Sequence, residues 1–301
     1  MIKVRDAAFV RFAAPDLDRA AMFLTDFGLE IAERSDDVLH ARGTDPSAYL
    51  YVAERGEPGF RGVAFEAASA RDLEAAAAME GASGPEPLDG PGGGSRVRLT
   101  DPDGFGVEIV HGRTPAAARP VAQALVNRGS EVRRRGQLHR AARGPAAVKR
   151  LGHVVLRVAD YATSAQWYRS RFGFLVSDEV HLGEPGNVVT AFLRCDRGQD
   201  YTDHHTLLCV GLGEVGFDHA AFEVEDVDAV MTGHDHLAAA GYDHHAGVGR
   251  HVLGSQVFDY WRDPWGHVME HFTDGDLLNA GHEAGRHDAA TALGTQWGRF
   301  A

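Results

Sequence analysis

Cysteine is scarce in this sequence, and long hydrophobic runs are missing. Only Cys195 and Cys209 occur among 301 residues, too few for a disulfide framework or a cysteine-rich metal site. The sequence has no run of about 18 apolar residues, and the N-terminus MIKVRDAAFV carries no signal-peptide core. We therefore expect a cytoplasmic protein without membrane contact, in which any metal is held by histidine and carboxylate.

Positive charge is also in short supply. Acidic residues number 43 against 30 lysines and arginines, giving a net charge of −13, whereas phosphate binding needs a basic footprint. The arginine-rich stretch NRGSEVRRRGQLHRAARGPAAVKR, residues 127–150, is the exception, but no aromatic stacking residues interrupt it. We interpret it as a linker packed against acidic surface, with a phosphate-binding arm as the weaker alternative, and expect no nucleic-acid partner.

An internal repeat is present. FAAPDLDRAAMFLTDFGL, from residue 12, matches RVADYATSAQWYRSRFGF, from residue 157, at an offset of 145. Each copy predicts a strand followed by an amphipathic helix that ends at a glycine, Gly28 or Gly173. Residues 62–76 likewise match 219–233, and residues 99–112 match 261–274. Each half of the chain is therefore a tandem pair.

The repeat predicts an α+β fold of four βαβββ modules, paired into two cup-shaped half-barrel domains. We expect an N-terminal module pair at 1–112, a linker at 113–149, a catalytic module pair at 150–273 and a tail at 274–301. The tail carries Trp297 and Phe300, which would make it a lid over the site.

The two halves differ in their histidines. His153 corresponds to Ala8 at the offset of 145, and in the downstream matches His219 corresponds to Gly62 and Glu270 to Glu108. A site that needs all three side chains can form only in the C-terminal half. We expect the N-terminal half to be metal-free, with an empty or filled cup.

His153, His219 and Glu270 are the candidate metal ligands. They lie in RLGHVVLRV, GFDHAAFEV and GHVMEHF, three short apolar segments in which period-two alternation turns them toward the cup. Two imidazoles and one carboxylate form the facial arrangement of non-heme Fe(II), and the same donors accept Mn(II). Unrelated polar residues on strands are the alternative, which the joint loss of both histidines from the other half disfavours.

Three further residues are candidates for the chemistry. His205 is expected on a strand before His219, facing the metal, with His204 pointing the opposite way if the strand is regular; a surface histidine is the alternative. Tyr260 precedes Glu270 across the DPWG turn and is expected on the neighbouring strand, unless it is a core tyrosine. His251 is expected in a glycine-containing loop, close to His244 and His245, where it either contacts the substrate or has no part in the chemistry.

Two histidines near Glu270 are excluded from the site by the same alternation. His267 and His271 are expected to point away from the face that carries Glu270.

As a set, the segments RLGHVVLRV, DHHTLL, DHAAFEV and GRHVLGSQVFDYWRDPWGHVMEHF resemble the type I extradiol ring-cleaving dioxygenases of the vicinal oxygen chelate superfamily. The resemblance is to enzymes of the catechol 2,3-dioxygenase and 2,3-dihydroxybiphenyl 1,2-dioxygenase kind and covers nearly the whole chain. It implies modules of the glyoxalase/bleomycin-resistance type. The DPWG turn alone would indicate only the superfamily, which also contains lyases and epimerases.

The resemblance implies a role for each candidate. His153, His219 and Glu270 would bind Fe(II), His205 would steer oxygen and transfer protons, and Tyr260 and His251 would contact a substrate hydroxyl. The partners would be a catecholic substrate and O₂, and the protein would be a homo-oligomer. Some relatives have an aspartate three residues after the histidine at 251, where this chain has Gly254, which leaves open what orients the active-site histidine here.

The leading hypothesis is an Fe(II)-dependent extradiol dioxygenase that incorporates both atoms of O₂. A metal-dependent lyase or isomerase is the enzymatic alternative, and turnover without oxygen would indicate it. A ligand-binding protein would instead bind its ligand tightly without metal. The identity of the catechol is not given by the sequence.

Overall fold

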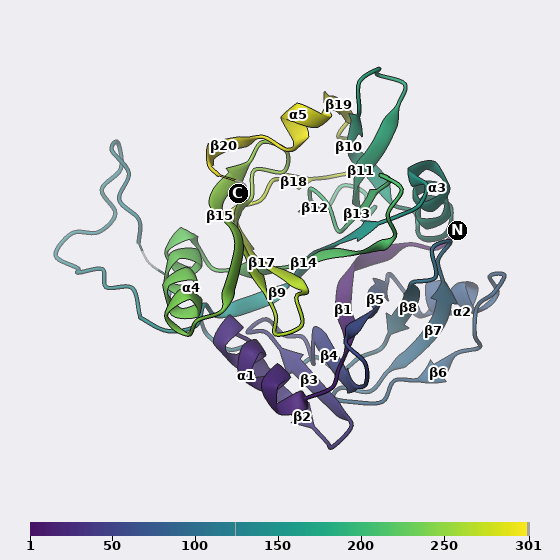
Figure 1. Ribbon diagram of the computed structural model, residues 1–301, viewed down its shortest axis with the longest axis horizontal. Helices are drawn as coiled ribbons and strands as arrows, with labels where there is room; N and C mark the ends of the chain where they lie inside the picture. The colour runs from purple at the N-terminus through teal and green to yellow at the C-terminus, as the bar shows by residue number, and fades with distance from the viewer. Residues whose placement is uncertain (124, 300–301) are drawn as a thin grey trace.

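Two curled sheets, one in each half of the chain, form the frame of the molecule (Figure 1). The computed structural model describes residues 1–123 and 125–299. Each sheet is built from two modules in which a strand, a helix and further strands follow one another. The first strands of the two modules lie side by side in the middle of each sheet, β1 beside β5 and β9 beside β14.

The N-terminal sheet has the strand order β2-β3-β4-β1-β5-β8-β7-β6. Its elements are β1 (Val4–Ala14), α1 (Leu17–Phe27), β2 (Glu30–Arg34), β3 (Val38–Arg42), β4 (Tyr51–Arg55), β5 (Gly59–Ala67), α2 (Ala70–Ala77), β6 (Glu86–Pro87), β7 (Ser95–Thr100) and β8 (Gly106–His111).

The C-terminal sheet has the strand order β19-β10-β11-β13-β9-β14-β17-β16-β15-β20, and β12 pairs separately with β18. The elements are β9 (Val148–Arg157), α3 (Tyr161–Phe172), β10 (Leu175–His181), β11 (Val188–Arg194), β12 (Thr202–Asp203), β13 (Leu207–Val210), β14 (Gly216–Val224), α4 (Val227–Ala239), β15 (Asp243–His251), β16 (Val257–Arg262), β17 (Val268–Thr273), β18 (Leu277–Leu278), β19 (Gly285–Asp288), α5 (Ala289–Ala292) and β20 (Thr295–Gly298).

The first helix of each half begins at a capping aspartate and ends at the predicted glycine. The carboxylates of Asp16 and Asp160 accept hydrogen bonds from backbone N–H groups of the first turn. Gly28 and Gly173 end the helices in the left-handed region, at φ 104° and 74°, where glycine carries no Cβ penalty. Helix α3 is one residue longer than α1, so the repeat offset is 144 before the helices and 145 after them.

This one-residue difference corrects the predicted correspondence between His153 and Ala8. In the C-terminal sheet His153 lies opposite Ala221, and in the N-terminal sheet the residue opposite Ala64 is Phe9. The equivalent of His153 is therefore Phe9, because a helix insertion shifts everything before it by one residue. The other two correspondences hold, since Gly62 and Glu108 take the register positions of His219 and Glu270.

The N-terminal cup is filled. Phe9 and Tyr49 rings lie 4.9 Å apart in a buried cluster with small and branched apolar residues. Arg11 Nε donates to Glu108 Oε1 over 2.9 Å, and Arg96 Nη1 lies 3.4 Å from Oε2. The charge of Glu108 is thus balanced by two guanidinium groups.

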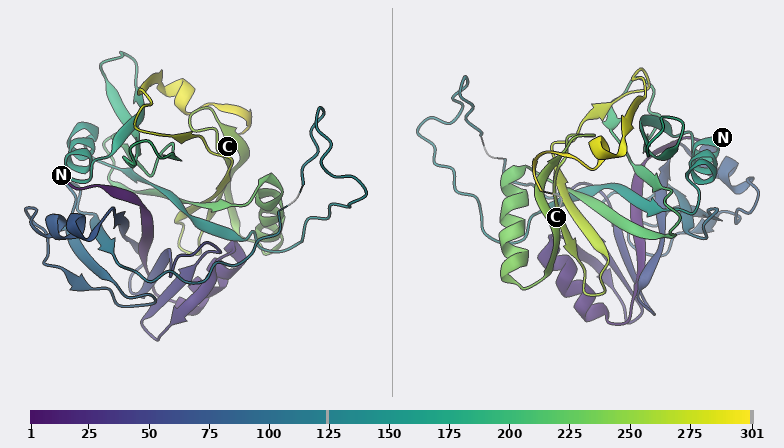
Figure 2. Two further views of the ribbon diagram at one scale, coloured as in Figure 1. Left: turned by 180° about the vertical axis from the view of Figure 1, so that it is seen from behind. Right: turned by 45° about the horizontal axis from the view of Figure 1, so that its top comes forward.

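One continuous core joins the two halves. Val154, Leu156 and Phe222, which alternate with the cup-facing residues, pack outward in this core together with Phe12 and Phe27 of the other half. Phe27 and Phe222 meet edge to face at 5.7 Å. The outer faces of the two sheets and their helices therefore bury one another (Figure 2).

The turn at residues 101–104, which matches the DPWG turn of the C-terminal half, links the halves. Asp101 accepts a 2.9 Å hydrogen bond from the Tyr168 hydroxyl. Asp103 accepts from Ser164 Oγ at 2.9 Å and from the backbone of Ala159 at 3.0 Å. This turn therefore has a structural role at the start of α3.

The tail pairs with both edges of the C-terminal sheet. β19 runs parallel to β10 at one edge, and β20 runs antiparallel to β15 at the other, with α5 between them (Figure 1). Trp297 lies over the Arg250 guanidinium, 5.7 Å from ring centroid to Cζ, and is half exposed, so it packs beside Arg250 and not over the metal candidates. Phe300, the other expected lid residue, lies outside the described residues.

Between β8 and β9, the middle of the described chain loops away from the body of the molecule (Figures 1 and 2). Its described residues form one isolated bridge, between Arg128 and Glu131. Within 1–123 and 125–299, no helix is both long and apolar enough to cross a membrane.

Candidate metal centre

One row of cross-strand partners places the candidate residues on a single face. On four neighbouring strands, His153 of β9, Ala221 of β14, Glu270 of β17 and Tyr260 of β16 lie opposite one another. His219 is two residues from Ala221 on β14 and therefore points to the same face. The small side chain of Ala221 leaves the space in which the two imidazoles and the carboxylate meet.

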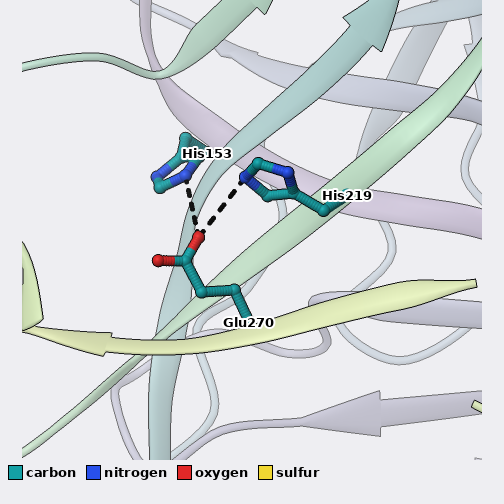
Figure 3. A group of neighbouring side chains, drawn as sticks. All are labelled: His153, His219 and Glu270. Carbon is teal, nitrogen blue, oxygen red and sulfur yellow. Dashed lines mark ion pairs between the residues drawn. The ribbon is translucent and has the colours of Figure 1, made fainter. Parts of the chain in front are cut away.

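The three ligand candidates converge on one point (Figure 3). Glu270 Oε2 lies 3.2 Å from His153 Nε2 and 3.4 Å from His219 Nε2. One ligand atom from each residue falls within 4.8 Å of the others, and the side chain of Glu270 is fully buried. These separations suit three ligands arranged around a single ion.

Glu270 provides the test of whether a metal fits. Neither of its oxygens accepts a well-formed hydrogen bond from the described residues, although the side chain has no solvent exposure. Burial alone would raise the carboxyl pKa, but His153 and His219 outweigh burial and hold the pKa well below its usual range. A buried carboxylate without hydrogen bonds is costly, and a bound cation would remove that cost.

His234, His244 and Asp259 form a second group of possible ligands, but the carboxylate of this group already has hydrogen-bond partners. Asp259 is approached by His244 Nε2 at 2.9 Å, by His234 Nδ1 at 3.2 Å and by Trp261 Nε1 at 2.6 Å. All three nitrogens can donate, so this buried carboxylate is already satisfied without an ion.

His219 is oriented by its neighbour in the chain, which the sequence reading did not single out. Asp218 Oδ1 lies 2.7 Å from His219 Nδ1, so the proton is held there and Nε2 is free for a metal. Burial lowers the pKa of His219, but the hydrogen bond to Asp218 and the nearby charge of Glu270 outweigh burial and raise the pKa to about 9. A cation bound at Nε2 would displace the second proton of the ring, which the raised pKa otherwise holds there.

His205 lies next to the cluster but not on a strand, contrary to the prediction. It sits in a bend between β12 and β13, and its ring centroid is 4.0 Å from that of His153. His204 lies in a bend, so the regular strand on which its opposite orientation depended is absent, and His204 Nδ1 lies 3.2 Å from His205 Nδ1. Burial holds the pKa of His205 well below its usual range.

Tyr260 and His251 border the cluster on the other side. The Tyr260 hydroxyl lies 3.0 Å from His251 Nε2, and His251 Nε2 lies 4.0 Å from Glu270 Oε1. Burial, followed by the charge of Glu270, raises the pKa of Tyr260 well above its usual range. Burial lowers the pKa of His251 to about 4. At neutral pH the cluster is therefore flanked by a neutral phenol and neutral imidazoles.

His267 and His271 point elsewhere, as predicted. His267 Nδ1 bonds to Asp263 within the turn at 2.8 Å, and His271 Nε2 donates to the backbone oxygen of Phe27 at 2.7 Å.

The chain matches the sequence model of the Glyoxalase/Bleomycin resistance protein/Dioxygenase superfamily over residues 7–109 and 150–271. Metapyrocatechase 2 of Cupriavidus necator is 33% identical over 94% of this chain and 86% of that protein. An iron-dependent extradiol dioxygenase of Rhodococcus jostii is 25% identical over 99% of this chain and 97% of that protein.

Solved structures share the fold. A Mn(II)-bound glyoxalase from Novosphingobium aromaticivorans has a TM-score of 0.81 at 24% identity, covering 100% of this chain and 93% of that one. Homoprotocatechuate 2,3-dioxygenase from Brevibacterium fuscum, in complex with 3,4-dihydroxyphenylacetate, has a TM-score of 0.77 at 19% identity, covering 96% and 86%. The predicted fold class, with its paired half-barrels, is confirmed.

Proposed function

Because the chain belongs to the Glyoxalase/Bleomycin resistance protein/Dioxygenase superfamily, we propose that it is an Fe(II)-dependent extradiol dioxygenase. It would open the ring of a catechol-type substrate beside the two hydroxyls, with incorporation of both atoms of O₂. The observation that carries the proposal is the buried cluster of two histidines and a glutamate, flanked by His205 on one side and Tyr260 on the other.

His153, His219 and Glu270 would hold the metal through Nε2, Nε2 and one carboxylate oxygen. Fe(II), when bound, supplies a common site for the diol and for oxygen and a path for electrons between them. The ligand types also suit Mn(II), and metal analysis of the purified protein distinguishes the two ions.

Tyr260 and His251 are proposed to position the substrate. A phenol that stays protonated at neutral pH donates a hydrogen bond to a substrate oxygen, and the neutral His251 beside it accepts or donates one. Fixing the diol in this way removes orientational freedom before the reaction, an effect worth up to about 7–11 kcal/mol in well-oriented cases.

His205 is proposed as the proton-transfer group. The pKa of His205 lies below the usual value because the ring is buried. The imidazole is therefore neutral at neutral pH, and its free nitrogen can accept a proton from a substrate hydroxyl. The same nitrogen would return the proton later in the cycle. General acid–base catalysis of this kind contributes about 10²–10⁴-fold.

The partners in this proposal are a catecholic small molecule and O₂. Self-association into a homo-oligomer, which the resemblance implies, is measured directly as the mass of the protein in solution.

Oxygen uptake by the full-length chain, loaded with Fe(II) under anaerobic conditions, tests the proposed function. The substrates are catechols of increasing bulk, from unsubstituted catechol to biphenyl-2,3-diol and 3,4-dihydroxyphenylacetate. We expect uptake with at least one of them and a ring-opened product spectrum. His219→Ala should abolish uptake, and His236→Ala, which changes a histidine on the outer helix α4, should not. No uptake with any catechol contradicts the proposal; turnover without oxygen supports a lyase or isomerase instead.

A further inference from the structure

Four side chains form a hydrogen-bonded row from the metal cluster to the protein exterior. His205 Nδ1 lies 3.2 Å from His204 Nδ1, His204 Nε2 lies 2.7 Å from Asp178 Oδ2, and Asp178 Oδ1 lies 2.9 Å from His287 Nε2. His204 and His205 are buried, Asp178 on β10 is nearly so, and His287 on the tail strand β19 is partly exposed. The row thus joins three separate parts of the chain.

Donor and acceptor rules determine where the protons lie in this row. Hydrogen bonds from His204 and His287 outweigh the effect of burial and lower the pKa of Asp178, so it is a carboxylate that only accepts. The proton of His204 is therefore held on Nε2 against Asp178, and its Nδ1 is placed to accept from His205. The facing Nδ1 of His205 must then be the donor, and Nε2 of His205 is left without a proton.

Gly254 makes room for this arrangement. It has φ 78°, and a Cβ at this position would lie 2.9 Å from Gln256 Oε1 and 3.1 Å from His204 Nδ1, the atom that meets His205. Two backbone hydrogen bonds hold this region together. The His204 N–H donates to the Asp276 carbonyl, and the Asp276 N–H donates to the Gly254 carbonyl, each over 2.9 Å. A larger residue at 254 would therefore crowd both Gln256 and His204.

We propose that His204 and Asp178 are positioning residues that fix His205 in its Nδ1–H tautomer, with His287 of the tail holding the second oxygen of Asp178. This proposal rests on the proposed role of His205. It answers the question left by the glycine at 254: the contact that orients the active-site histidine comes from His204 in this chain. A His205 whose Nε2 is unprotonated begins the reaction as a base, ready to take the proton of a substrate hydroxyl.

A row that merely ties the tail to the sheet would stabilise the fold without selecting a tautomer. The tautomer itself is therefore the deciding quantity, and long-range ¹⁵N–¹H correlation spectra of histidine-labelled protein report it for each ring. The full-length chain is loaded with Zn(II), a diamagnetic ion that His and carboxylate ligands accept, and the His205 signals are assigned by their loss in His205→Gln.

We expect wild-type His205 to show the Nδ1–H tautomer. In Asp178→Asn the amide can turn and donate, so His204 Nε2 need not carry its proton and His205 should shift toward the Nε2–H form. With Fe(II) and a catechol, kcat should fall about 10–100-fold, with iron content and KM little changed. His287→Gln, whose amide nitrogen can replace Nε2, should retain more activity than His287→Ala.

The inference is overturned if wild-type His205 carries its proton on Nε2, or if Asp178→Asn changes neither the tautomer nor kcat. If a variant fails to fold, the wild-type spectrum still decides the tautomer. The spectrum needs neither catechol nor oxygen, so it remains decisive when the proposed reaction is absent. A reactive enzyme with the Nε2–H tautomer would contradict this inference alone.

Discussion

Glu108 and Glu270 occupy equivalent register positions but have different partners. Glu108 is bonded to Arg11 and Arg96, whereas Glu270 faces two histidines and accepts no well-formed hydrogen bond from the described residues. The same residue type therefore serves a structural ion pair in one cup and a candidate metal site in the other. At the scale of the residue, the partner determines the role of the carboxylate.

Replacing each glutamate by glutamine separates these roles. Glu108→Gln should leave the metal content unchanged and lower the free energy of unfolding by about 1.5–3 kcal/mol, because charge-assisted hydrogen bonds are lost. Glu270→Gln should abolish metal binding. Urea unfolding and metal analysis of both variants measure these effects. Loss of metal from Glu108→Gln would contradict this assignment.

Tyr260→Phe tests the substrate-positioning phenol. The ring keeps its packing, but His251 Nε2 loses its 3.0 Å partner and the substrate loses a donor. We expect kcat/KM to fall about 10²-fold with normal iron content. Tyr242→Phe is the matched control, since its hydroxyl bonds to Asp26 at 2.8 Å, away from the site. Equal losses in both variants would show that the Tyr260 effect is not specific.

The sequence predicts that the three ligand candidates share one face, because each of them lies in a strand. Alternation holds for His153, His219 and Glu270, and the hairpin places Tyr260 opposite Glu270 as expected. It fails for His204, which lies in a bend. It also gives no signal for Asp178, since the contact depends on how β10 and the loop before β13 are placed in space.

At the scale of the element, the tail extends both edges of the C-terminal sheet, through β19 and β20. Its strands span two to four residues each, too short to show a periodic pattern, so their pairing with both sheet edges could not be predicted from the sequence. The longer strands and the capped helices carry clear patterns and appear where expected. The one-residue error in the repeat register arose because helix length varies between modules.

Truncation after Ala289 tests the contribution of the tail to binding. The variant keeps His287 but loses β20, which pairs with β15, and loses the 3.0 Å bond from Gln296 to the backbone oxygen of His251. We expect KM for the catechol to rise about tenfold, the equivalent of one or two hydrogen bonds. Steady-state kinetics measure the change, and an unchanged KM would discard a role for this segment in binding.

Trp297→Ala is the companion control. The side chain lies over Arg250 and is half exposed, so its loss should leave KM unchanged. A rise as large as that of the truncated chain would mean that Trp297 itself covers the substrate.

At the scale of the whole molecule, His271 joins the two halves and makes stability depend on pH. Its ring stacks on Phe27 of the other half at 3.9 Å, and burial lowers its pKa below 6.5. Above pH 6.5 the ring is neutral in both folded and unfolded states. As the pH falls below 6.5 the unfolded chain binds the proton first, so stability is lost down to the lowered pKa, by up to about 1.4 kcal/mol per pH unit.

His271→Gln should reduce this dependence. The amide can keep the hydrogen bond to the Phe27 carbonyl but does not titrate. The free energy of unfolding in urea should therefore fall less between pH 7 and pH 5 in the variant than in the wild type. Identical slopes would show that His271 is not the group responsible.

The fate of the oxygen atoms tests the central claim most directly. The iron-loaded full-length chain is reacted with a catechol that it consumes under ¹⁸O₂, and the ring-opened product is analysed by mass spectrometry. We expect both labelled atoms to appear in the product. A product with one labelled atom or none, or one formed equally fast without oxygen, would contradict the assignment as an extradiol dioxygenase.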